Sequence, residues 1–188
     1  LRTSIYSWLT AKRDNWTFFM RLEDTDQTRF VPGTADVLIK VVNWLWITVD
    51  EWFMWEWVPE VWEFGPYVQS KRKDLYKKYA LELVEKDAAY FCFCPKIDRD
   101  TEVVDPKLYD IHDRVCRNLS KEEIKAKIEA GESYVIKHKV PLNQTVEIND
   151  IIHGKKIIDT NTVDDSVLLK SDGHATYHLA HIVDDYLM

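Results

Sequence analysis

The chain has 188 residues, of which 46% are hydrophobic and 30% charged, and its formal net charge is −7. This balance is typical of a globular protein with a sizeable core and excludes a disordered or fibrous chain. The net charge argues against a uniformly basic nucleic-acid-binding protein, although local basic patches can still contact phosphates. No apolar run approaches the roughly 20 residues of a membrane helix, so we expect no membrane span. Because Leu1 is not Met and the start does not resemble a signal peptide, we expect an internal fragment or a processed chain.

The first 87 residues alternate between predicted helices and strands. The helices are predicted over residues 2–13, 34–45 and 70–87, and the strands over 16–23 and 47–49. Thr34 and Ser70 are expected to cap the second and third helices, because a hydroxyl can accept a hydrogen bond from the first free backbone N–H groups. Val37, Leu38 and Val42 belong to the apolar stripe of the second helix. Strands separated by helices favour a parallel sheet with helical crossovers, which is an α/β fold.

The pattern changes near residue 89. An extended segment over 90–94 and a polar loop over 95–118 precede a helix that begins with a capping box, Ser120 to Glu123, and ends at Gly131. Further strands are predicted over 134–140, 145–148, 156–158 and 167–169. Residues 89–174 therefore predict an inserted α+β subdomain. The segment 176–180 predicts a strand that returns to the first sheet, so that residues 1–88 and 175–188 form one domain.

The end of the strand predicted over 16–23 is strongly charged. Arg21 and Glu23 lie on the same side of such a strand, and Asp24 and Asp26 follow before the turn at 32–33. Ligands of open α/β sheets bind at the carboxyl ends of the strands, so this segment predicts a ligand-binding loop. The alternative is an acidic turn that is only solvated by water.

Three cysteines, Cys92, Cys94 and Cys116, lie close together in the predicted insertion. Their odd number argues against a disulfide framework and for a reducing compartment. Two thiolates one residue apart and a third further along leave one position of a tetrahedral zinc site, which His112 can fill. The alternative is three reduced thiols that pack as small apolar side chains.

Six of the eight tryptophans fall within residues 44–62. A segment as apolar as 52–62 has to be buried locally or to dock on another molecule, because large exposed apolar patches usually mark interfaces. We therefore consider a protein partner for residues 52–62, burial within the chain, or an artefact of sequencing, design or drift.

Several motifs together resemble the bacterial and organellar glutamyl-tRNA synthetases. These motifs are Met20-Arg-Leu-Glu-Asp-Thr-Asp26, Gly65-Pro-Tyr-Val-Gln-Ser-Lys-Arg72, Leu169-Lys-Ser-Asp-Gly173, Thr176-Tyr-His-Leu-Ala180 and Val183-Asp-Asp-Tyr-Leu-Met188. They occur in the order of that family and cover nearly the whole chain. The resemblance implies part of a Rossmann-like nucleotide-binding catalytic domain, interrupted by a connective subdomain that binds the acceptor end of tRNA.

The activity implied by the resemblance is a class I glutamate–tRNA ligase. Such an enzyme forms glutamyl-adenylate from L-glutamate and ATP and transfers the glutamyl group to tRNA, in the cytoplasm or the mitochondrion. The family's two ATP signatures do not occur in residues 1–188, so we expect an incomplete ATP site and no activity of this polypeptide alone. The alternative is a non-catalytic, synthetase-like component of a larger assembly, and a third reading is a designed or truncated derivative.

The resemblance also implies individual roles. Glu23 would bind the α-ammonium group of glutamate beside Arg21, Tyr177 would border the same pocket, and His181 stands where the family usually has Asn. The candidate tRNA contacts are Arg114, Arg117 and Lys170, for which a solvated basic surface is the alternative. Zinc-bearing relatives use a Tyr as a ligand, so Tyr109 competes with His112. We expect no metal at His178 and His181, because an extended segment would place them on opposite faces.

Overall fold

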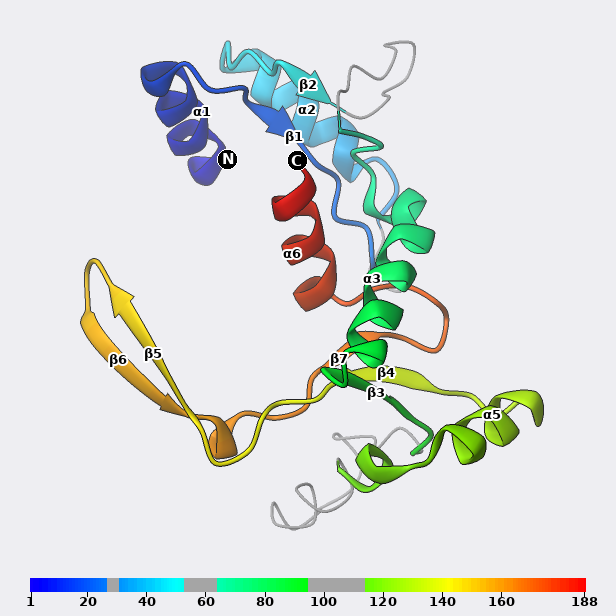
Figure 1. The fold of residues 1–188 in the computed structure, drawn as a ribbon. Helices are drawn as coiled ribbons and strands as arrows, with labels where there is room; N and C mark the ends of the chain where they lie inside the picture. Colours follow the sequence, from blue (N-terminus) through cyan, green and yellow to red (C-terminus); the bar gives the residue numbers. More distant parts are fainter. Residues whose placement is uncertain (27–30, 53–63, 95–113) are drawn as a thin grey trace, which may run out of the picture. The chain divides into compact units, whose positions relative to one another are not determined.

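The computed structural model describes residues 1–26, 31–52, 64–94 and 114–188 (Figure 1). The chain divides into two compact units, the first formed by residues 1–74 and 180–188 and the second by residues 75–179. These boundaries differ from those of the predicted catalytic domain and insertion, and that functional division stays a prediction. Most of the tryptophan-rich segment 52–62 lies outside the described residues.

The first unit contains a parallel strand pair with a helical crossover. Helix α1 (Arg2–Asp14) leads to β1 (Phe19–Met20), and α2 (Thr34–Trp44) connects β1 to β2 (Glu51–Trp52) (Figure 1). Phe19 pairs with Glu51 and Met20 with Trp52 in parallel register, which confirms the predicted parallel arrangement. A core of Ala11, Phe18, Val42 and Ile47 holds α1 and α2 against these strands.

Several predicted details of this unit are wrong. The first strand has two residues, continued only by a parallel bridge from Leu22 to Val68, and β2 begins after the predicted segment 47–49. Thr34 is the first residue of α2 and not its cap; Gly33 precedes it with a φ of 83° and makes no side-chain capping bond. A left-handed φ is accessible to glycine because it has no Cβ, so the turn at 32–33 determines where the helix begins.

The third helix begins later than predicted. A 3₁₀ turn, η2 (Gln69–Arg72), comes first, and α3 (Lys73–Glu85) follows it. Ser70 therefore does not cap α3. Its backbone N–H instead donates to Asp24 Oδ1 at 2.8 Å, which ties the start of η2 to the acidic loop after β1. That bond shows that Asp24 is not simply a solvated charge.

The second unit is built on an antiparallel sheet in the order β3-β4-β7. Its strands are β3 (Ala89–Cys92), β4 (Val135–His138) and β7 (Val167–Leu169), as predicted. Helix α5 (Lys121–Glu129) has the predicted capping box, in which Glu123 N donates to Ser120 Oγ at 3.2 Å and Ser120 N to Glu123 Oε2 at 2.8 Å. Short turns η3 (Val115–Asn118) and η4 (Thr160–Thr162) complete this part.

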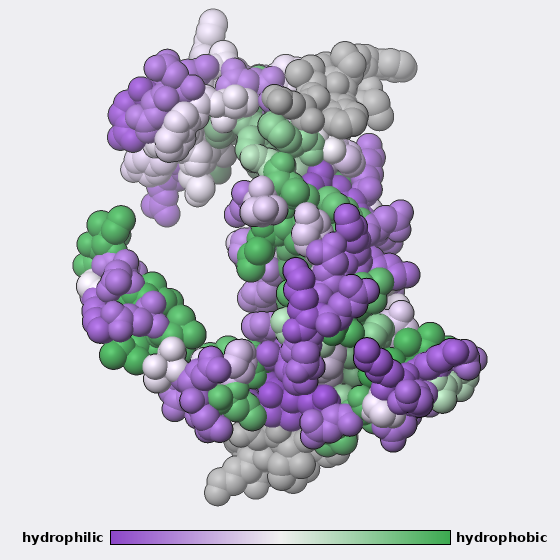
Figure 2. Space-filling view, in the orientation of Figure 1, coloured by the Kyte–Doolittle hydropathy of each residue, from purple (hydrophilic) through white to green (hydrophobic). Residues whose placement is uncertain are grey.

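A separate hairpin of the second unit is formed by β5 (Thr145–Asp150) and β6 (Gly154–Asp159). Almost all of its residues are exposed on both faces. Figure 2 shows hydrophobic side chains along it, and those at its tip, Ile151 and Ile152, are 102% and 86% exposed.

The strand predicted over 176–180 is wrong, because this segment begins helix α6 (Tyr177–Leu187). The alternation from Thr176 to Ala180 suggested a strand. The buried residues Leu179, Ala180 and Val183, however, repeat at helical spacing over a longer stretch. Just before the helix, Ala175 forms an antiparallel bridge with Leu169. Over the described residues, none of the helices combines the length and the apolar character needed to cross a membrane.

Candidate amino-acid-binding site

The site begins at the carboxyl end of β1 with Arg21 and Glu23. Arg21 Nη2 and Nε lie 3.0 and 3.4 Å from Glu23 Oε1. The Arg21 side chain is only 12% exposed. Burial opposes its charge, but hydrogen bonds to the carboxylates of Glu23 and Asp185 outweigh this effect and raise the pKa of Arg21. The guanidinium therefore stays a fixed positive charge beside Glu23.

Helix α6 brings two further carboxylates to the same guanidinium. Arg21 Nη1 donates to Asp185 Oδ1 at 3.1 Å, and Arg21 Nε lies 3.6 Å from Asp184 Oδ2. Asp184 is fully buried and accepts hydrogen bonds from Gln69 Nε2 and Arg72 Nε, both at 2.9 Å. Three motifs that are distant in the sequence, at the end of β1, in η2 and at the end of α6, thus meet around Asp184.

The charges of this cluster favour a cationic ligand. The three carboxylates of Glu23, Asp184 and Asp185 face two guanidiniums, those of Arg21 and Arg72. Glu23 is the carboxylate at the strand end, with 41% of its side chain exposed. An ammonium group would be bound there by a charge-assisted hydrogen bond.

The two other predicted pocket residues lie on α6. His181 precedes Asp184 by three positions and Asp185 by four, which places it on the helix side that carries these carboxylates. Tyr177 is 58% exposed and belongs to the second unit, where its ring makes an edge contact with His178 at a centroid distance of 6.0 Å. The pocket roles of both residues stay predictions.

The prediction that His178 and His181 lie on opposite faces of an extended segment is wrong. Both residues lie on α6 at a spacing of three, which brings side chains onto neighbouring positions of a helix surface. No described cluster of three potential metal ligands includes either of them.

The three cysteines come together as predicted in the second unit. All their sulfur atoms lie within 4.8 Å of one another, and the Cys94 and Cys116 sulfurs are 3.6 Å apart. Sulfurs bound to one tetrahedral zinc ion at about 2.3 Å would be about 3.8 Å apart, so the cluster is close to the geometry required. The fourth-ligand candidates, Tyr109 and His112, lie outside the described residues.

Burial favours the protonated form of the Cys92 and Cys94 thiols when no metal is bound. Desolvation, reinforced by the hydrogen bond to Cys116, raises the pKa of Cys94 to about 12. The pKa of Cys92 is also raised, again mainly because burial disfavours the thiolate. A bound divalent ion would reverse this preference by stabilising the thiolates directly.

The candidate tRNA contacts differ in their surroundings. Arg117 forms a bidentate ion pair with the buried Asp165 and also donates to the Val140 carbonyl at 3.1 Å. Arg114 makes one longer bond, 3.4 Å to the Val163 carbonyl. Lys170 Nζ lies 3.7 Å from Asp172. Their roles toward tRNA stay predictions, and the geometry gives Arg117 a structural role as well.

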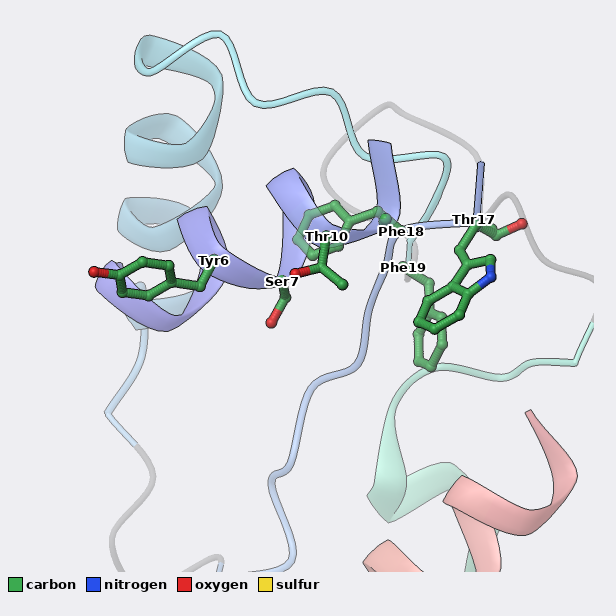
Figure 3. A pocket seen from close by; sticks show the side chains of 8 residues that line it. Tyr6, Ser7, Thr10, Thr17, Phe18 and Phe19 are labelled. Atoms are coloured by element: carbon green, nitrogen blue, oxygen red, sulfur yellow. The ribbon is translucent and has the colours of Figure 1, made fainter. Parts of the chain in front are cut away.

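An open hollow of about 500 Å³ lies elsewhere in the first unit (Figure 3). It is lined by α1 and by the segment leading into β1, with Tyr6, Thr10 and Phe19 among its side chains. None of its lining residues belongs to the Arg21–Glu23 cluster, so the two features are separate.

The residues that support the Arg21–Glu23 pair were not identified as site residues from the sequence. Asp184, Gln69 and Arg72 lie in the motifs that carry the family resemblance, and that was the available signal. Their contacts span 115 and 112 residues of the chain, and such pairings leave no local pattern.

Comparison with known proteins identifies the class. The family model described as tRNA synthetases class I (E and Q), catalytic domain, matches residues 1–188. The chain therefore belongs to the catalytic domain of the class I tRNA synthetases, and its predicted α/β class is confirmed.

The relatives are glutamate–tRNA ligases. Those of Finegoldia magna and Alkaliphilus metalliredigens are 45% and 42% identical to the chain, with all of this chain covered. A crystal structure of a glutamate tRNA ligase from Elizabethkingia meningosepticum in complex with its amino acid has a TM-score of 0.81 at 33% identity, again over the whole chain. Another, from Elizabethkingia anophelis, has a TM-score of 0.82 at 33% identity. The chain spans 38–40% of the length of these proteins.

Proposed function

We propose that the protein carrying this chain is a glutamate–tRNA ligase, which uses ATP to join L-glutamate to tRNA. The observation that carries the proposal is the Glu23 carboxylate at the end of β1, held by Arg21 within a site whose charges favour a cation. The full-length similarity to glutamate–tRNA ligases supports the same conclusion.

The reaction requires positioning more than covalent catalysis by side chains. A glutamate carboxylate oxygen attacks the α-phosphorus of ATP, and pyrophosphate leaves. A ribose hydroxyl of tRNA then attacks the activated carbonyl carbon, and AMP leaves. In this reaction Glu23 would hold the α-ammonium group, while His181 and Tyr177 would border the pocket. The groups that bind the phosphates of ATP are expected outside residues 1–188.

The second unit would contact tRNA and bind a structural zinc ion. Arg114 and Lys170 are the proposed phosphate contacts, since both are cations of the second unit and arginine and lysine are the side chains that neutralise phosphates. Cys92, Cys94 and Cys116 would hold the zinc, with His112 or Tyr109 as the fourth ligand. The zinc would stabilise the fold around β3 and η3 and take no part in the reaction.

The test is glutamylation of tRNA by the full-length protein, measured with radiolabelled glutamate at varied concentration. Glu23→Gln is expected to raise the KM for glutamate by at least about tenfold, because it removes the charge opposite the ammonium group. Glu129→Gln, a matched change at an exposed position of α5, is expected to leave that KM unchanged. No glutamylation by the wild type would instead favour the non-catalytic component.

An unchanged KM in Glu23→Gln would overturn the assignment of the ammonium site.

Two further predictions stay open to test. One is a protein partner for the segment 52–62, and the other is location in the cytoplasm or the mitochondrion.

A further inference from the structure

We propose that Asp184 is a positioning residue for glutamate binding, which acts on Glu23 through the guanidinium of Arg21. The proposal rests on the proposed function, in which Glu23 binds the substrate ammonium group. Asp184 itself is fully buried and would not touch the substrate.

Asp184 is a rigid anchor because its own contacts are fixed. Gln69 Nε2 and Arg72 Nε each donate to a different oxygen of its carboxylate at 2.9 Å. Arg72 is 5% exposed and also donates to the Phe64 carbonyl at 3.0 Å. A buried carboxylate is stable only when it is paired and hydrogen-bonded, and this one has both kinds of partner.

Arg21 connects Asp184 with Glu23, because its guanidinium contacts both carboxylates. Its Nε atom faces Asp184 Oδ2 at 3.6 Å and Glu23 Oε1 at 3.4 Å, so one donor lies between the two carboxylates. The planar guanidinium has a fixed fork of donors, and holding one edge therefore fixes the direction of the others. The position of Glu23 depends in this way on a carboxylate 161 residues further along the chain.

Asp184 also limits how strongly Arg21 neutralises Glu23. A guanidinium shared among three carboxylates gives each of them only part of its charge. When Asp184 loses its charge, Arg21 is expected to pair more closely with Glu23 and to compete with the substrate ammonium group. Asp185 cannot replace Asp184 in this role, because its side chain is 63% exposed and water screens its charge.

The experiment measures glutamylation of tRNA by full-length Asp184→Asn, which keeps the shape of the side chain and removes its charge. We expect the KM for glutamate to rise by about tenfold or more, and those for ATP and tRNA to stay within about twofold. Inhibition by glutarate, which lacks the α-amino group, should also stay within about twofold, because the lost interaction concerns the ammonium group alone.

Asp165→Asn is the matched control, since Asp165 is an equally buried and arginine-paired carboxylate of the second unit. It should lower the amount of active enzyme without changing the KM for glutamate. An Asp184→Asn variant that behaves like this control, with less active enzyme and unchanged KM values, would overturn the proposal.

Two further variants separate the remaining outcomes. If Asp184→Asn does not fold, Arg21→Gln tests the same connection, and an unchanged KM for glutamate in that variant would overturn the proposal. Glu23→Gln tests the underlying function independently. A raised KM in Glu23→Gln together with an unchanged one in Asp184→Asn rejects the positioning role alone, whereas unchanged values in both reject the ammonium site itself.

Discussion

Arg117 and Asp165 form a two-point ion pair inside the unit formed by residues 75–179. Arg117 Nε lies 2.5 Å from Asp165 Oδ2, and Arg117 Nη2 contacts the other carboxylate oxygen. The Tyr90 hydroxyl and the Val140 N–H also donate to Asp165, at 3.0 and 3.2 Å. Asp165 therefore connects η3 and β3 with the loops that flank the hairpin β5–β6.

Replacing Arg117 by Ala should destabilise this unit strongly, because it leaves a buried carboxylate without its cation. We expect a loss of about 3 kcal/mol, measured as faster hydrogen exchange of the β3 and β4 amides in the full-length protein. Arg114→Ala is the control: it should change this exchange by less than about 0.5 kcal/mol while weakening tRNA binding. Equal exchange in Arg117→Ala and the wild type would show that the ion pair does not stabilise the unit.

The same ion pair should make the second unit sensitive to acid. Burial alone would raise the pKa of Asp165, but hydrogen bonds from Arg117, Val140 and Tyr90 outweigh it and hold the pKa below its usual value. A lowered pKa contributes stability above the pKa of the unfolded chain, about 3.9, and this contribution is lost as the pH falls through the folded-state pKa.

We therefore expect protection of the β4 amides to decrease below about pH 4 in the wild type, and less so in Asp165→Asn. Asp150 and Asp172 also have lowered pKa values and are present in both proteins, so the difference between the two curves isolates Asp165. Parallel curves would contradict the prediction.

Two local signals in the sequence were confirmed, whereas the helix caps predicted at Thr34 and Ser70 were wrong. The capping box at Ser120 and Glu123 and the close spacing of Cys92 and Cys94 depend on neighbouring residues, and the structure has both. The segment 176–180 was misread because five residues fit an alternating pattern, whereas the helix is defined by buried positions as far as Asp184.

Tertiary pairing explains what could not be predicted. The bond from Arg72 to Asp184 spans 112 residues and the one from Arg117 to Asp165 spans 48, and no periodicity reveals either pair. The charged end of the first strand predicted a ligand-binding loop at Glu23, and the resemblance to a known family implied which ligand it binds. The side chains that support it, Gln69, Arg72 and Asp184, could be identified only from the structure, because they come from η2 and α6.

The capping box should determine the local stability of α5. Ser120→Ala removes the acceptor for the Glu123 N–H and should cost about 1 kcal/mol, seen as faster exchange of the amides in the first turn of the helix. Ser120→Asp, which can still cap, should retain most of the protection, and Ser133→Ala serves as an exposed control. Equal loss in the Ala and Asp variants would mean that the contribution does not come from capping.

The cysteine cluster should bind zinc, and the binding should be coupled to the order of the second unit. Elemental analysis of full-length protein purified without chelator is expected to give about one zinc per chain, and a value below about 0.2 would leave three reduced thiols as the explanation. Replacing Cys92, Cys94 or Cys116 by Ser should abolish binding. It should also reduce protection of the β3 amides, because structural zinc couples on the order of 10 kcal/mol of binding to folding.

The fourth ligand and the pH dependence of zinc binding follow from the same chemistry. His112→Ala and Tyr109→Phe distinguish the two candidates, since only the variant lacking the true ligand should lose zinc.

Because the pKa of Cys94 is raised to about 12 without metal, zinc binding must displace thiol protons, and the affinity should decrease as the pH falls. Zinc-free protein should react slowly with iodoacetamide near neutral pH, since the raised pKa values of Cys92 and Cys94 disfavour their thiolates, and Cys92 and Cys116 are buried. Rapid alkylation of Cys94 in zinc-free protein would contradict the raised pKa, and a zinc affinity independent of pH would contradict coordination by these thiolates.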